Sequence, residues 1–95
     1  VASRTKPIPK TPQGLKARTE GTRVVLQWQP NPEPDIRKYV IYKLGFFSKS
    51  KLGETEKPGF AFRGEKGKSY RIKIIAIDST NLESEASEDV SIEVK

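Results

Sequence analysis

Apolar and polar residues alternate in several short segments of the chain, which is the pattern of half-buried β-strands. Residues 24–29 and 69–78 alternate most regularly, and residues 60–62 and 90–94 alternate over shorter lengths. Residues 39–42 are expected to form another short strand. No segment of useful length has the period of a helix. The side chains expected to point into the core are Leu26, Trp28, Tyr39, Ile41, Tyr70, Ile72 and Ile74.

Turn-forming residues separate these segments. Pro30, Pro32 and Pro34 form a stiff loop after the first strong strand, and Ser79-Thr80-Asn81 follows the longest one. Residues 46–52 are less regular and are expected to be a short strand with its loop. Six or seven short strands at close spacing predict an all-β fold, either an antiparallel sandwich or a barrel.

The N-terminal residues are rich in proline. Pro7, Pro9 and Pro12 each fix φ and lack an amide donor, so this stretch is neither a helix nor a central strand. We expect residues 1–11 to be a semi-rigid linker and residues 12–95 to be one domain. The missing methionine suggests a piece of a longer protein.

The composition excludes most forms of catalysis. The 95 residues include no cysteine and no histidine, which removes thiol nucleophiles, disulfides, thiolate metal sites and imidazole general bases. We therefore expect a non-enzymatic protein without a cofactor or a metal. The longest apolar run, residues 74–77, is strand-sized and far shorter than the roughly 20 residues of a membrane helix, so no membrane insertion is expected.

The net charge of +6 has two interpretations. It keeps a small domain soluble. It also favours an anionic polymer, either an acidic glycan or a nucleic acid, as a partner.

Four motifs occur in order along the chain. They are Pro12-x-Gly14-Leu15, Val24-x-Leu26-x-Trp28, Asp35-Ile36-x-x-Tyr39-x-Ile41-Tyr42 and Gly67-x-x-Tyr70-x-Ile72-x-Ile74-x-Ala76. Together they resemble a fibronectin type III domain from Pro12 to Val94. Asp78, followed by Leu82-Glu83-Ser84 and Ser87, looks like the bacterial variety of this module.

The resemblance implies an immunoglobulin-like, seven-stranded antiparallel sandwich of two sheets, monomeric in isolation. It implies a spacer or protein–protein interaction module of a larger, exported bacterial protein, in an extracellular, periplasmic or cell-surface location. The expected partner is a neighbouring domain or another protein chain; the alternative is a basic module for an anionic polymer. Tyr70 fits a tyrosine corner, whereas Gly64 stands where the family usually has leucine.

Two surfaces are candidate binding sites. Residues that alternate with the core on two neighbouring strands of this fold are expected to form an exposed apolar interaction face, unless lysine stems and residues 46–47 cover it. Its members are Val40, Tyr42, Ile75 and Ile77. The loops at the end of the fold near the C-terminus are expected to form an anion-binding pole. Its members are Lys49, Lys51, Arg63, Lys66 and Lys68.

Two further sites are less favoured. Asp35, Asp78 and Glu83 lie in loops of the opposite pole, but their spacing matches no calcium loop. Phe46-Phe47 with its neighbouring lysines has the composition of a base-stacking site, yet the same residues suit edge packing.

Overall fold

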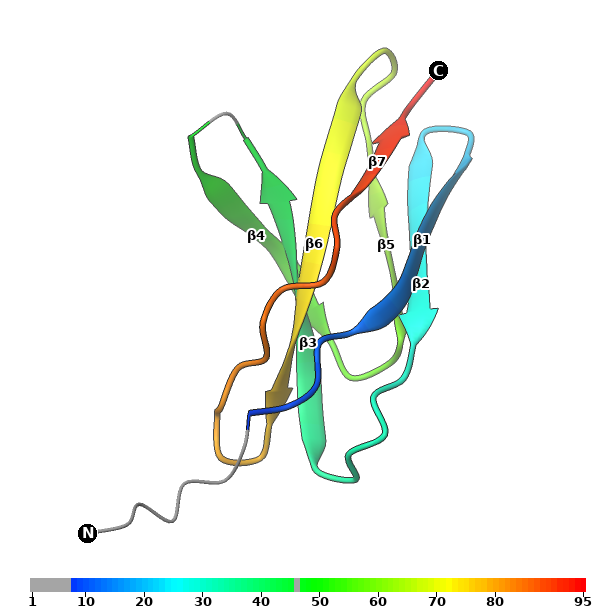
Figure 1. Ribbon diagram of the computed structural model, residues 1–95. Helices are drawn as coiled ribbons and strands as arrows, with labels where there is room; N and C mark the ends of the chain where they lie inside the picture. The colour runs from blue at the N-terminus through cyan, green and yellow to red at the C-terminus, as the bar shows by residue number, and fades with distance from the viewer. Residues whose placement is uncertain (1–7, 46) are drawn as a thin grey trace, which may run out of the picture.

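The computed structural model describes residues 8–45 and 47–95, which form two sheets and contain no helix (Figure 1). The strands are β1 (Gln13–Glu20), β2 (Arg23–Gln29), β3 (Ile36–Leu44), β4 (Lys49–Thr55), β5 (Gly59–Arg63), β6 (Ser69–Asp78) and β7 (Val90–Glu93). One sheet has the order β1-β2-β5 and the other β4-β3-β6-β7. All neighbouring strands are antiparallel, and no pairing among the described residues joins the two sheets, so the expected two-sheet sandwich is confirmed and the barrel is wrong.

The core lies between the two sheets and follows the alternation of the sequence. β2 contributes Val24, Leu26 and Trp28, and the facing sheet contributes side chains from β3 and β6. Trp28 and Tyr39 meet edge to face with ring centroids 5.2 Å apart, a favourable aromatic geometry. All seven expected core residues belong to this cluster, with Tyr70 at its partly buried margin.

Gly64 marks the corner before β6, and its small size has a steric reason. A Cβ at this position would lie 2.8 Å from Val94 Cγ2 and 3.1 Å from the Tyr70 ring. The Tyr70 hydroxyl accepts a 2.8 Å hydrogen bond from the Glu65 amide, as a tyrosine corner requires. Phe62 packs edge to face on the same ring at 5.4 Å. The glycine thus makes room for an aromatic corner where the family usually has leucine.

Two serine side chains complete the edge of β6 before β7 begins. The amides of Ile74 and Ala76 donate to the hydroxyls of Ser87 at 3.0 Å and Ser84 at 2.8 Å. The serine amides donate back to the carbonyls of the same two β6 residues, each at 2.8 Å. Residues 84–87 therefore follow β6 without forming a regular strand, and side-chain oxygens take the place of backbone carbonyls.

The described part of the proline-rich segment packs on the β2–β3 loop. Pro9 and Pro12 are buried. The Lys10 amide donates to Glu33 at 2.7 Å, and the Asn31 side chain donates to the Lys10 carbonyl at 2.6 Å. Residues 9–11 therefore pack with the domain, whereas residues 1–7 of the expected linker lie outside the described residues.

Candidate interaction surfaces

The long axis of the sandwich separates two sets of loops (Figure 1). The β1–β2 turn, the β3–β4 loop and the β5–β6 loop lie at the end where the chain finishes. We call this end, with its flanking strand ends, the basic pole. The β2–β3 and β6–β7 loops lie at the other end, where the described chain begins, and we call it the acidic pole.

Basic side chains outnumber carboxylates at the basic pole. The basic residues are Arg18, Arg23, Lys43, Lys49, Arg63, Lys66, Lys68 and Lys95, and the acidic ones are Glu20, Glu65 and Glu93. Glu20 pairs with two arginines, at 2.9 and 3.9 Å, and Glu65 pairs with Lys68 at 3.0 Å. The Glu65 carboxylate raises the pKa of Lys68 through this contact. Because these pairs are exposed, they contribute little to stability.

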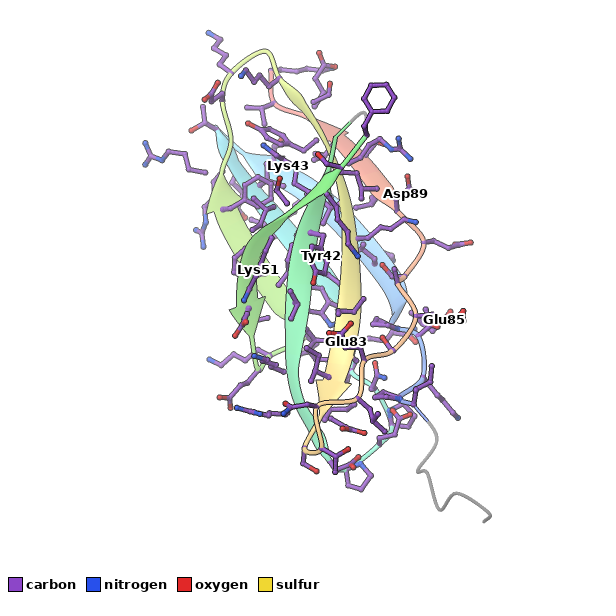
Figure 2. All side chains as sticks on the ribbon, turned by 90° about the vertical axis from the view of Figure 1, so that its left-hand side faces the viewer. Tyr42, Lys43, Lys51, Glu83, Glu85 and Asp89 are labelled. Atoms are coloured by element: carbon purple, nitrogen blue, oxygen red, sulfur yellow. The ribbon has the colours of Figure 1, made fainter. Side chains whose placement is uncertain are left out.

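The structure brings four of the five expected anion-binding residues to the basic pole. Lys51 is the exception, because it lies farther along β4, opposite Tyr42 (Figure 2). Lys51 pairs with Glu54, which also accepts a hydrogen bond from Lys38 at 3.1 Å. The hydrogen bonds from Lys51 and Lys38 lower the pKa of Glu54. Lys51 therefore shares the Glu54 carboxylate with Lys38 on the sheet face.

Lys43 belongs to the basic pole although the sequence analysis did not single it out. It follows Tyr39 and Ile41 on the inner side of β3, and its ammonium group lies 5.9 Å from the centroid of the Tyr70 ring. On the outer side, the Lys49 ammonium lies 4.5 Å from the centroid of the Tyr42 ring. Both distances allow cation–π attraction. The alternation along β3 could have identified Lys43, because it places this cation on the side of the strand that faces the core.

The expected apolar interaction face is mostly covered. Val40, Ile75 and Ile77 expose only 3%, 5% and 8% of their surface, so the expectation of an exposed patch is wrong at these three positions. Glu54 lies opposite Val40 and draws the Lys38 and Lys51 side chains across the face. Tyr42 remains half-buried beneath Lys49. Lysine stems provide the cover, whereas Phe47 is 97% exposed and provides none.

Carboxylates at the acidic pole hold loops in place. Asp78 is only 2% exposed, and its Oδ1 accepts hydrogen bonds from the Thr80 amide and hydroxyl at 2.8 and 2.7 Å and from the Leu82 amide at 3.0 Å. Burial opposes ionisation of Glu33, but hydrogen bonds from the Lys10 backbone, its own backbone and Asn31 lower its pKa overall. Within residues 8–45 and 47–95, no three acidic side chains gather as a metal site, and Asp35, Asp78 and Glu83 are no exception.

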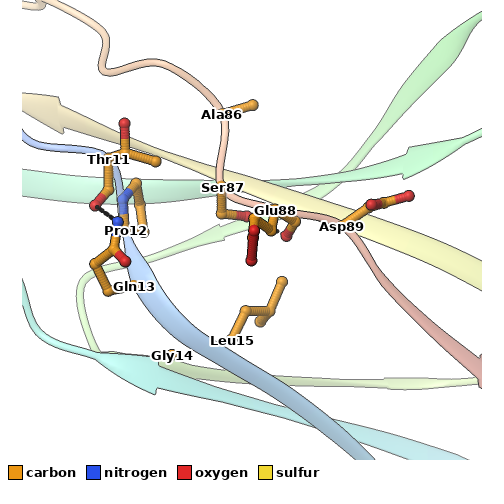
Figure 3. Close-up of a pocket in the computed structure, with 9 residues that line it drawn as sticks. All are labelled: Thr11, Pro12, Gln13, Gly14, Leu15, Ala86, Ser87, Glu88 and Asp89. Carbon is orange, nitrogen blue, oxygen red and sulfur yellow. Dashed lines mark hydrogen bonds between the residues drawn. The ribbon is translucent and has the colours of Figure 1, made fainter.

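A shallow groove of about 350 Å³ runs between the start of β1 and the segment before β7 (Figure 3). It is lined by Thr11, Pro12, Gln13, Gly14, Leu15, Ala86, Ser87, Glu88 and Asp89. The Gln13 side chain donates to the Thr11 carbonyl at 3.1 Å. Arg71 binds Asp89 at 2.6 Å and lowers its pKa, so that this carboxylate is already engaged. The lining offers no paired acid and base.

No protein-family model and no curated protein sequence matches the chain. Solved structures do match it. The structure called "FN3tt mut" superposes with a TM-score of 0.81 at 16% identity, over 93% of this chain and 98% of the other. The human fibronectin type III domain containing protein 3 has a domain that matches with a TM-score of 0.77 at 20% identity, over 96% of this chain and 90% of the other. The chain has the fibronectin type III fold.

The same fold also occurs inside much longer chains. The twitchin kinase region from C.elegans matches with a TM-score of 0.80 at 22% identity, over 93% of this chain but only 17% of the other. The described part of the chain has no helix long and apolar enough to cross a membrane.

Proposed function

We propose that this fibronectin type III domain is a non-catalytic spacer or protein–protein interaction module of a larger, exported bacterial protein. The observation that carries the proposal is that the described chain begins at one pole and ends at the other (Figure 1). When the chain enters a domain at one pole and leaves it at the other, the domain holds its neighbours apart. The separation is about 33 Å, the length of a ten-residue strand such as β6.

The N-terminal contacts support the spacer role. Lys10 is tied to Glu33 and Asn31 through its backbone amide and carbonyl, which restricts the angle at which the chain enters the acidic pole. Spacers that hold a direction need such contacts, because a flexible joint would lose the orientation. The bacterial and exported context is supported by the resemblance around Asp78, Ser84 and Ser87.

A replacement experiment in the parent protein tests this role. An unrelated sandwich domain with its ends at opposite poles replaces residues 8–95, and the activity or assembly of the parent is measured. Preserved function identifies a spacer, and lost function identifies a specific protein-binding surface. Turnover of a substrate by the isolated domain, abolished by replacing one carboxylate, would overturn the proposal. Recovery of the parent from the cytoplasmic fraction would overturn the exported location.

The alternative, a module for an anionic polymer, depends on the cations of the basic pole. Its test is an amide chemical-shift titration of the 95-residue chain with an acidic polysaccharide, a short oligonucleotide and a neutral polysaccharide, each at two salt concentrations. Salt-sensitive shifts at Lys49, Lys66 and Lys68 with the two anionic ligands would support it, because binding through several phosphates or sulfates weakens steeply with salt.

A further inference from the structure

β5 is the last strand of its sheet, and among residues 8–45 and 47–95 no strand pairs with its outer edge. The hydrogen bonds that flank β5 show which of its groups face that edge. The Trp28 amide donates to the Pro58 carbonyl at 3.1 Å, and the Gly64 amide donates to the Thr22 carbonyl at 2.7 Å. The even-numbered residues of this strand therefore bond to β2, because the direction of the backbone groups alternates along an antiparallel strand. The odd-numbered residues of β5 direct their N–H and C=O groups to the open edge.

The edge of β5 lacks the features that keep edge strands from pairing between molecules. Charged side chains, bulges and short length are the usual ones. β4 carries the exposed lysines Lys49 and Lys51, β1 has a register irregularity after Gln13, and β7 has only four residues. In β5 the residues from Gly59 to Phe62 are uncharged, and a charge occurs only at its last residue. β5 is therefore the edge best suited to accept a further strand.

A strand added to this edge would also cover apolar surface. Phe60 and Phe62 pack against the core but remain partly exposed at its margin. Ala61 is also partly exposed, and it lies between them on the opposite face of the strand. The added strand would therefore shield two phenylalanines on one face and meet a small side chain on the other.

We propose that this edge pairs with the same strand of a second copy of the chain, antiparallel and about a two-fold axis at Ala61. In this register Ala61 faces its own counterpart, and Gly59 faces Arg63 of the second copy. Phe60 then faces Phe62 of the second copy, and no two like charges are opposed along the strand. The result is one continuous sheet built from β1, β2 and β5 of both copies. The proposal goes beyond the spacer role, because a spacer acts without pairing to its own copies.

The charges of the two poles favour this antiparallel orientation. β5 runs from the β4–β5 turn at the acidic pole to the β5–β6 loop at the basic pole (Figure 1). The turn carries Glu56 and the loop carries Lys66, both exposed and neither in an ion pair with another described residue. Antiparallel pairing brings each basic pole beside the acidic pole of the other copy, whereas parallel pairing would bring like charges together. Because the strand and its flanking charges complement themselves, a second copy is favoured over an unrelated strand.

The association is weak, because a single pair of strands makes a small interface. We expect a dissociation constant of about 0.1–1 mM. Most of the chain is then monomeric at low micromolar concentration, and pairing becomes important only where copies are concentrated.

Sedimentation velocity of the 95-residue chain at rising concentration tests the pairing. The weight-average sedimentation coefficient should rise as the concentration approaches about 1 mM. Ala61→Lys should weaken the association about tenfold or more, because it opposes two cations across the axis. The matched control is Ser91→Lys, which adds the same charge at an exposed position of β7 and should associate like the unchanged chain. The emission of Trp28, which is 6% exposed in the core, reports whether each variant is folded.

Hydrogen exchange locates the contact within the chain. The amides of Ala61 and Arg63 should exchange quickly in dilute solution and more slowly as the concentration rises. The amides of Phe60 and Phe62 already bond to β2, so they should be protected at every concentration. This contrast between neighbouring residues is specific to pairing through the open edge of β5.

A spin label tests the orientation. The chain has no cysteine, so Lys66→Cys provides a single attachment point for the label. The labelled chain is mixed with isotope-labelled unmodified chain, so that any broadening of amide signals arises between molecules. Antiparallel pairing should broaden the amides of Glu56 and Lys57 at the other end of β5.

Four results would overturn the proposal. The first is an absence of association at about 1 mM. The second is equal association by the Ala61→Lys variant and the unchanged chain. The third is full protection of the Ala61 and Arg63 amides in dilute solution, which would show that the edge is covered within one chain. The fourth is broadening confined to the β5–β6 loop, which would show that like poles meet. None of these results affects the spacer proposal, which is tested in the parent protein.

Discussion

At the acidic pole, carboxylates accept hydrogen bonds from loop backbone, whereas at the basic pole most cations form exposed ion pairs or rest over tyrosine rings. Asp78 holds the β6–β7 loop through three donors, and Glu33 holds the incoming chain through Lys10. The basic pole is fixed by Gly64 and the Tyr70 hydroxyl instead. Charged loop residues can therefore stabilise the loops at one end of the domain and lie at the surface at the other end.

Removal of the Asp78 carboxylate should give the largest difference between the poles. Asp78→Ala leaves the Thr80 and Leu82 amides of the β6–β7 loop without their acceptor and should destabilise the domain by about 2–4 kcal/mol. Lys66→Ala at the basic pole should change stability by less than about 0.5 kcal/mol. Urea unfolding followed by Trp28 emission measures both. Equal losses for the two variants would contradict a structural role confined to the acidic carboxylate.

A methyl group at Gly64 should destabilise the basic pole where charge changes do not. Gly64→Ala places a Cβ 2.8 Å from Val94 Cγ2 in a buried position, and overpacking of this kind costs about 1–3 kcal/mol. Thermal unfolding by circular dichroism measures the loss. The matched control is Gly45→Ala in the β3–β4 loop, where the nearest contact of a Cβ is 3.4 Å. A Gly64→Ala variant as stable as this control would show that the corner relaxes freely.

Acid should release the N-terminal segment with a smaller effect. The pKa of Glu33 is lowered in the folded protein, so its contribution to stability is complete above the ordinary glutamate pKa and is lost as the pH falls through the lower folded value. Protection of the Lys10 amide from hydrogen exchange should fall over the same pH range. Glu33→Gln should remove this pH dependence, and a Lys10 amide that stays protected in acid would exclude Glu33 as its acceptor.

The sandwich and its core were predictable because they depend on the alternation of apolar and polar residues, which is visible in the sequence itself. Val24, Leu26 and Trp28 face inward on every second position, and Tyr70 begins the strand that completes the corner. The wide separation of the basic and acidic loops was also predictable once the strand order was assumed. In these regions one residue's position on its own strand decides its environment.

The covered outer face was not predictable from alternation alone. Val40 and Ile75 are paired across β3 and β6, and their burial depends on where Glu54 of β4 holds the Lys38 and Lys51 side chains. A register irregularity between Ile41 and Tyr42 sets that position. The exposure of this face therefore depends on long side chains from both β3 and β4, and the pattern of a single strand does not contain this information.

The two serine hydroxyls beside β6 have a consequence for self-association. β6 contains the apolar run Ile74-Ile75-Ala76-Ile77, and a strand of this composition with an open edge is a template for intermolecular pairing and aggregation. Ser84 and Ser87 occupy the amides of that edge with side-chain oxygens in place of a full partner strand. Separation of residues 84–87 from β6 would expose these amides beside an apolar run, so the two hydroxyls should oppose intermolecular strand pairing at this edge.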